Sequence, residues 1–185
     1  MAKNWKIRKD LSIEVYGHTL FRIDCTHDFK EIKAGTLGGY IEKEKNLDGN
    51  AWVSGNAQVY GNAWVSGNAQ VSGDAQVYGN AWVSGDAQVS GDARVSDNAR
   101  VYGDKITNKD DICYISNRYY NITITPLHIK IGCQYHAQEA WWNFTDEQIE
   151  KMDGESALNF WKIWKEPLKQ ICDAMKKEKG EKDVK

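Results

Sequence analysis

Two residues suited to nucleophilic chemistry lie close together towards the end of the chain. Cys133 and His136 are separated by two residues, and a histidine that takes the proton of a nearby thiol turns it into a nucleophile. The surrounding sequence offers no obvious third group to orient the histidine and no oxyanion loop. The favoured interpretation is therefore that Cys133 is a small buried residue and that His136 is a polar residue in a loop or at a helix start.

The same stretch and the residues just before it combine aromatic rings with hydrogen-bond donors. Rings beside a guanidinium and an imidazole suit a base or a sugar that carries a phosphate, because they supply stacking surfaces together with donors. A purely structural role, in which the rings fill a core, is the alternative. The predicted ligand-binding residues are Arg118, Tyr119, Tyr120, Tyr135, His136, Trp141 and Trp142.

These candidates lie outside a repeat that occupies the middle of the chain. Val59–Trp64 and Val77–Trp82 are the same hexapeptide, Val-Tyr-Gly-Asn-Ala-Trp, at an offset of eighteen residues (77 − 59). From Leu47 to Ile106 each unit opens on a branched apolar residue, and Gly-Asn or Gly-Asp followed by Ala recurs in nearly all of them. Val favours extended backbone, and Gly before Asn or Asp favours a tight turn. This short period predicts a solenoid whose core lies between its coils.

Alignment at eighteen residues sorts the outward side chains into columns. Tyr60 falls over Tyr78, Trp64 falls over Trp82, and Arg100 follows in the tryptophan column. Adjacent strands lie about 4.8 Å apart, so aligned rings touch. We expect one continuous aromatic ladder on a single face. Exposed apolar patches usually contact something, so these five residues are the predicted interaction face, for the chain's own terminal segments, for another subunit or for a ligand.

The candidate metal ligands have no spacing typical of a metal site. The four cysteines lie far apart, without the pair separated by two residues that zinc sites commonly use. Asp74 and Asp92 share a column of the repeat, but aspartate there simply replaces asparagine in the turn. We therefore expect no metal and no cofactor. The cysteines are Cys25, Cys113, Cys133 and Cys172.

The six-residue pattern resembles the hexapeptide repeats of left-handed parallel β-helices. That resemblance implies three hexapeptides per coil. It also raises an acyltransferase as an alternative, since such enzymes usually use a histidine at a coil surface as the base toward an acyl-CoA thioester. The repeat itself contains no histidine: His18 and His27 precede it, and His128 and His136 follow it. A general base must lie within hydrogen-bond reach of its substrate, so this placement weakens the alternative.

The segments on either side of the repeat have patterns of their own. Alternating apolar residues around Tyr16-Gly17-His18 predict a β-hairpin, and residues 1–40 are the expected N-terminal cap of the solenoid. Short apolar runs after the repeat predict a small antiparallel sheet. A capping box then opens a short helix that ends at Gly154, and a longer helix with one apolar face follows. Pro167 is expected to kink that helix or to start a new one.

The entry into the repeat carries a second resemblance. Leu20–Glu42, which contains Ala34-Gly35-Thr36-Leu37-Gly38-Gly39, is similar to the lead-in of uncharacterised phage and prophage hexapeptide-repeat proteins. The Gly132-Cys133 dipeptide before the closing helices is similar to the tails of the same group. The resemblance implies a viral origin and names no activity.

Charge and hydropathy exclude several classes of protein. The formal net charge is −2, whereas a nucleic-acid groove needs a positive surface. The N-terminus lacks the apolar run of a signal peptide, and no stretch is long and apolar enough to span a membrane. Dispersed cysteines without a secretion signal favour a reducing cytosol. We expect a cytoplasmic protein of the host cell that binds neither nucleic acid nor membrane.

These observations predict a mainly β protein. Its parts are an N-terminal hairpin cap at residues 1–40, a left-handed parallel β-helix at residues 41–106, and a small α+β domain at residues 107–185. The expected function is that of a phage-encoded, non-enzymatic binding protein, oligomeric and most simply a homotrimer, that acts by host interaction or counter-defence. Two partners fit: a host defence protein blocked by surface contact, and a nucleotide-like small molecule sequestered by the C-terminal aromatics. A structural or assembly protein is a further alternative.

Overall fold

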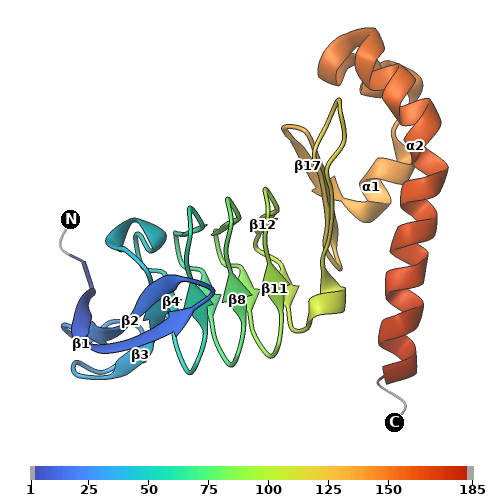
Figure 1. Ribbon diagram of the computed structural model, residues 1–185. Helices are drawn as coiled ribbons and strands as arrows, with labels where there is room; N and C mark the ends of the chain where they lie inside the picture. Colours follow the sequence, from blue (N-terminus) through green and yellow to red (C-terminus); the bar gives the residue numbers. More distant parts are fainter. Residues whose placement is uncertain (1–2, 183–185) are drawn as a thin grey trace. The chain divides into compact units, whose positions relative to one another are not determined.

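The computed structural model describes residues 3–182, with side chains described for residues 3–177 (Figure 1). The chain divides into two compact units, Met1–Ile112 and Cys113–Lys185. The boundary falls after the 3-10 turn η2 (Lys109–Asp111) and not directly after the repeat. The Asp111 carboxylate accepts hydrogen bonds from the amide and the hydroxyl of Thr107, which ties this turn to the end of the last coil.

The first unit contains a parallel β-solenoid built from the repeat. Strands eighteen residues apart pair in parallel: Gln58 with Gln76, Trp64 with Trp82, and Gln70 with Gln88. The last coil is one residue shorter, because Gln88 pairs with Lys105. The coil strands are β4 (Trp52–Val53), β5 (Gln58–Val59), β6 (Trp64–Val65), β7 (Gln70–Val71), β8 (Gln76–Val77), β9 (Trp82–Ser84), β10 (Gln88–Val89), β11 (Arg94–Val95), β12 (Arg100–Tyr102) and β13 (Lys105–Ile106).

The valines and alanines of the repeat form the core of the solenoid. Every repeat valine from Val53 to Val101 is 0% exposed. The turn glycines have positive φ, and a Cβ at Gly73 would lie 3.0 Å from the amide nitrogen of Gly91 in the next coil. Asparagines in the turns also bond along the stack, as from Asn62 to Asn80 at 3.3 Å. One short sequence pattern therefore determines the core, the turns and the hydrogen bonds between turns of successive coils.

The N-terminal hairpin extends one sheet of the solenoid. Strands β1 (Trp5–Val15) and β2 (His18–Cys25) are antiparallel, and β3 (Leu37–Ile41) pairs antiparallel with β2 and parallel with β5. Gly38 is needed for this packing, since a Cβ there would lie 2.4 Å from Cγ1 of Ile23. The six-stranded sheet has the order β1-β2-β3-β5-β8-β11, and the other two solenoid sheets are β13-β10-β7-β4 and β12-β9-β6.

The second unit is a four-stranded antiparallel sheet with two helical elements. Its strands are β14 (Cys113–Ile115), β15 (Ile122–Ile124), β16 (His128–Ile131) and β17 (Gln134–Ala137), in that order. Helices α1 (Gln138–Asn143) and α2 (Asp146–Lys182) follow. Isoleucines of β15 and β16 share one core with Trp141, Phe160, Trp161 and Leu168. Along the described part of the chain, no helix is both long and apolar enough to cross a membrane.

The long helix is broken where the sequence predicted the end of a short helix. Helix α2 is interrupted at Asp153 and Gly154, where Gly154 has φ +64° and Asp153 lies outside the helical region. This is the expected helix end at Gly154. The alternative that Pro167 starts a new helix is wrong, because the backbone remains helical through it; the kink expected there stays a prediction. Pro167 has no backbone N–H, so the carbonyl of Ile163 lacks its usual helical donor.

Candidate functional site

Three residues on one solenoid sheet form a continuous stack, called here the tryptophan stack: Trp64, Trp82 and Arg100. The two indoles lie 4.7 Å apart between centroids, and the Arg100 guanidinium lies 4.6 Å from the Trp82 ring. Each residue precedes a buried valine in β6, β9 or β12, so strand alternation turns it outward. All three remain partly exposed. The parallel register thus holds two rings and a cation in contact on the surface.

A second stack lies on the six-stranded sheet. Tyr60 and Tyr78 follow β5 and β8, and their rings are nearly parallel at 5.3 Å. The His18 ring lies 5.2 Å from Tyr60 on the side of the hairpin. Tyr60 is consequently only 5% exposed. Burial, together with the neighbouring Tyr78, raises the pKa of the Tyr60 hydroxyl.

The expected single ladder of Tyr60, Trp64, Tyr78 and Trp82 is wrong. The tyrosines belong to the sheet of β5 and β8, and the tryptophans belong to the sheet of β6 and β9. The reason is the position of the turn. Gly61 has φ +68°, so the chain changes direction between Tyr60 and Trp64 and carries them onto different sheets. Each hexapeptide that opens on valine therefore spans a corner of the coil.

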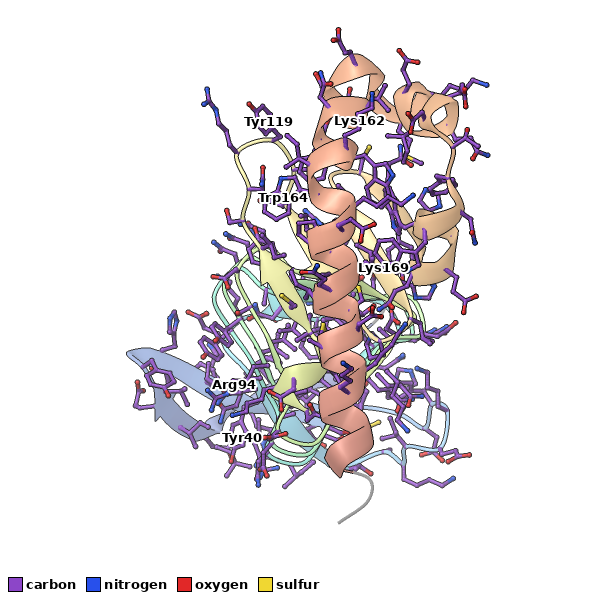
Figure 2. The ribbon with its side chains drawn as sticks, turned by 90° about the vertical axis from the view of Figure 1, so that its right-hand side faces the viewer. Tyr40, Arg94, Tyr119, Lys162, Trp164 and Lys169 are labelled. Atoms are coloured by element: carbon purple, nitrogen blue, oxygen red, sulfur yellow. The ribbon has the colours of Figure 1, made fainter. Side chains whose placement is uncertain are left out.

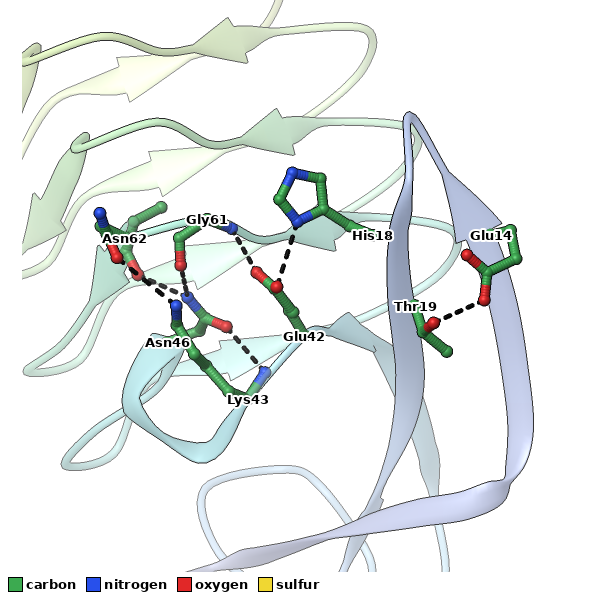
Figure 3. Close-up of polar contacts among 9 residues, drawn as sticks. Glu14, His18, Thr19, Glu42, Lys43, Asn46, Gly61 and Asn62 are labelled. Carbon is green, nitrogen blue, oxygen red and sulfur yellow. Dashed lines mark hydrogen bonds and ion pairs between the residues drawn. The ribbon is translucent and has the colours of Figure 1, made fainter.

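The hairpin brings a histidine against a carboxylate of the first coil (Figure 3). Nδ1 of His18 lies 3.1 Å from Oε1 of Glu42, and the other Glu42 oxygen accepts the amide of Gly61 at 2.6 Å. Burial alone would raise the pKa of the Glu42 carboxyl, but the bonds from His18 and Gly61 outweigh it and lower the pKa. The repeat has no histidine of its own, yet the fold supplies one to the coil beside Tyr60.

This contact was missed in the sequence, although a signal for part of it exists. Extending the columns back by one coil places Glu42 in the tyrosine column (60 − 18) and Asn46 in the tryptophan column (64 − 18). The pairing of Tyr40 with Gln58 supports that register. His18 has no such signal, because its position depends on how the hairpin folds against β3.

The predicted ligand-binding residues of the second unit do not form one site. Trp141 is 2% exposed, and its Nε1 donates to the carbonyl of Ile129 at 2.8 Å. Trp142 packs nearly parallel to Trp161 at 6.0 Å. These two tryptophans are therefore part of the packing between the helices and the sheet. The packing explains them without any ligand.

Strand alternation and a loop separate the other predicted residues. Tyr135 and His136 are neighbours in β17: Tyr135 stacks on His128 at 4.7 Å, while His136 meets the edge of Trp141 at 5.2 Å. Figure 2 shows Tyr119 on the loop between β14 and β15. Arg118 and Tyr119 are both exposed there. Tyr119 lines a pocket of about 210 Å³ with Phe160 and Trp164, which contains none of the other predicted residues.

A small pocket in this unit contains only two of the predicted residues. Its volume is about 50 Å³, and Tyr120 and Trp141 line it together with Cys133 and Phe160. The Tyr120 hydroxyl donates to Asp153 at 2.7 Å; burial and this carboxylate raise its pKa to about 12. Sites for drug-sized ligands measure roughly 300–1,000 Å³. The pocket is therefore far too small for a nucleotide.

Two expectations for the Cys133 and His136 pair are also wrong. Cys133 is exposed, because it follows the tight turn at Gly132. His136 lies inside strand β17, where burial lowers the pKa of its imidazole. Its Nε2 lies 3.3 Å from the side-chain oxygen of Gln134. Within the described residues, the structure shows no contact between this ring and the thiol that would make a nucleophile and base.

Comparison with protein families supports the solenoid. The YdcK beta solenoid repeat matches residues 57–73, 75–91, 87–103 and 93–106. These matches span strands β5 to β13 and leave both flanking segments outside. No curated protein matches the chain. The chain is thus a repeat β-solenoid protein.

Proposed function

We propose that the protein is a non-enzymatic binding protein that presents the tryptophan stack to a macromolecular partner. The observation that carries this proposal is the stack of Trp64, Trp82 and Arg100, which three neighbouring strands hold in contact while the side chains stay partly exposed. Tryptophan and arginine dominate the binding energy of many interfaces. Rings that are already ordered lose little conformational entropy on binding.

Assembly is the next part of the proposal. The eighteen-residue register is what three hexapeptides per coil require, and on the resemblance to left-handed β-helices we propose a left-handed coil and a homotrimer. The exposed rings of the tryptophan stack support self-association, since a second chain would remove them from water. Light scattering that gave one chain per particle across micromolar concentrations would exclude the trimer.

The origin and the partner are proposals from the same resemblance. The lead-in at Leu20–Glu42 supports a phage or prophage source, and hence counter-defence in the host cytoplasm by blocking a host defence protein. Sequestration of a nucleotide-like signal has weaker support. Its predicted residues are dispersed in the second unit. The pocket lined by Tyr120 and Trp141 measures about 50 Å³ and the one lined by Tyr119 about 210 Å³, both below the roughly 300–1,000 Å³ of sites for drug-sized ligands.

The test replaces both Trp64 and Trp82 with Gln. Gln already occupies the equivalent position in other coils, so the solenoid should fold, and circular dichroism checks this. The matched control replaces Gln70 and Gln88 with Ala on the adjoining sheet. Two properties are measured: the mass of the particle and the host protein that it retains from lysate. The wild type and the control should agree in both. The tryptophan variant should form a smaller particle, lose the host protein, or show both changes. If the tryptophan variant keeps both, the stack is not the interface and the proposal fails.

One observation favours a second candidate, an acyltransferase that uses acyl-CoA. His18 lies on the coil surface with its Nδ1 against Glu42, and a carboxylate in this position orients a histidine to act as a base through Nε2. An acyltransferase would consume acyl-CoA, would lose that activity in His18→Ala, and would keep it in His27→Ala. If the chain is a binding protein, the wild type and both histidine variants should consume no acyl-CoA thioester.

A further inference from the structure

The end of the tryptophan stack borders an open pocket. One face of the Trp64 indole packs on Trp82. Leu47 pairs in parallel with Val65, so residues 44–48 lie one strand before Trp64 and beside its other face. These residues and Lys3 surround a pocket of about 340 Å³. Its lining consists of Trp64, Leu47, Lys3, Glu44, Lys45 and Asp48.

The pocket exists because Asn46 does not extend the stack. By register Asn46 holds the column position before Trp64, but its side chain is 0% exposed. Its amide nitrogen donates to the carbonyls of Gly61 and Ala63 at 3.2 and 2.8 Å, and its oxygen accepts the Lys43 amide at 2.9 Å (Figure 3). These bonds turn the side chain into the coil. The outer face of Trp64 is therefore left to the pocket.

The rim of the pocket combines donors and acceptors without net charge. It carries two ammonium groups and two carboxylates, and the pair of Lys3 with Glu44 is already joined at 2.7 Å. The side chains of Lys45 and Asp48 make no hydrogen bond or ion pair with other described residues. A phosphate or a quaternary ammonium would favour an excess of one charge. Hydroxyl groups, which both donate and accept, suit this mixture.

We infer that this pocket binds a neutral saccharide ring, free or at the end of a glycan, stacked on Trp64 with its hydroxyls on Lys45 and Asp48. The C–H face of a sugar is weakly positive and complements the negative face of an indole. The volume lies at the lower end of the roughly 300–1,000 Å³ found for small-molecule sites. The inference rests on the proposed function and extends it. The macromolecular partner would contact the exposed side of the tryptophan stack, whereas the saccharide would bind at its end, on the outer face of Trp64.

The test titrates the full chain with methyl glycosides of glucose, galactose and N-acetylglucosamine and with the matching trisaccharides, by calorimetry and tryptophan fluorescence. At least one sugar should bind. The Trp64 ring is the stacking surface of the proposed site, so Trp64→Ala should weaken binding by about fivefold or more, and Asp48→Ala should weaken it measurably. Equal affinity for a methyl glycoside and its trisaccharide identifies a single free ring. A large preference for the trisaccharide identifies a glycan end.

Two controls keep this test separate from the protein contact. Arg100→Ala alters the far end of the stack and should leave sugar binding unchanged while it weakens the proposed partner contact. Asp48→Ala should do the reverse, and because Asp48 is exposed its fold should be intact. Adenosine monophosphate and choline serve as competing probes. Failure of all sugars to bind, tighter binding of either probe, or sugar binding that survives both Trp64→Ala and Asp48→Ala overturns the inference.

Discussion

Trp64 and Trp82 of the solenoid and Trp141 and Trp161 of the second unit are tryptophan pairs with opposite roles. In the solenoid, Trp64 and Trp82 stack on the outside of a core that is already filled by valine and alanine. In the second unit, Trp141 and Trp161 are themselves the core, at 2% and 3% exposure. Aromatic residues that cluster in the sequence therefore stay on the surface only where smaller side chains already fill the core. That difference moves the candidate site from the C-terminal cluster to the repeat.

The largest expected effect separates the inside of the solenoid from its outside. Val71→Asp places a charge at a position with 0% exposure, without a partner, and should cost several kcal/mol and abolish folding of the coil. Ser72→Asp, at the next and outward position, should cost less than about 1 kcal/mol. Circular dichroism and thermal melting compare the two. Equal stability of both variants would show that the valines are not the core.

A second prediction compares the two kinds of tryptophan directly. Trp141→Ala should destabilise the second unit by about 3–5 kcal/mol, because it removes a buried ring and leaves a cavity, and it strands the carbonyl of Ile129. The double change of Trp64 and Trp82 to Gln should cost much less. Urea unfolding followed by circular dichroism measures both. A larger loss for the double variant than for Trp141→Ala would mean that the stack is structural and that the comparison is wrong.

The smallest effect concerns pH and the hairpin. The pKa of Glu42 is lower in the folded chain than in the unfolded one, so its contribution to stability is complete above the unfolded value of roughly 4.3. It is lost as the pH falls from there through the lower folded value. Glu42→Gln should therefore remove part of the acid sensitivity of the melting temperature, while Glu14→Gln in strand β1 should retain it. Identical pH profiles for all three proteins would contradict this role.

The repeat allowed much of the first unit to be predicted. A six-residue period with Gly-Asn turns sets strand, corner and core locally, and stacking of like coils then places residue i beside residue i + 18. This is why the pairs Tyr60 with Tyr78 and Trp64 with Trp82 are stacked as expected. The division into two stacks was not predicted, since the alignment finds columns but does not say where each strand ends and the corner begins.

Sequence by itself therefore determined the parallel β-solenoid, its column register and the presence of closing helices. The solenoid and its register depend on the repeated hexapeptide, and the helices depend on a capping box and on apolar residues at helical spacing. Tertiary structure alone decided which aromatics are surface and which are core, that His18 meets Glu42, and that Asn46 folds inward beside Trp64. The His18 contact joins the hairpin turn to the first coil, two segments that share no period, and Asn46 turns inward through bonds to the backbone of the coil. Their geometry depends on how the segments pack, and no spacing along the chain encodes that packing.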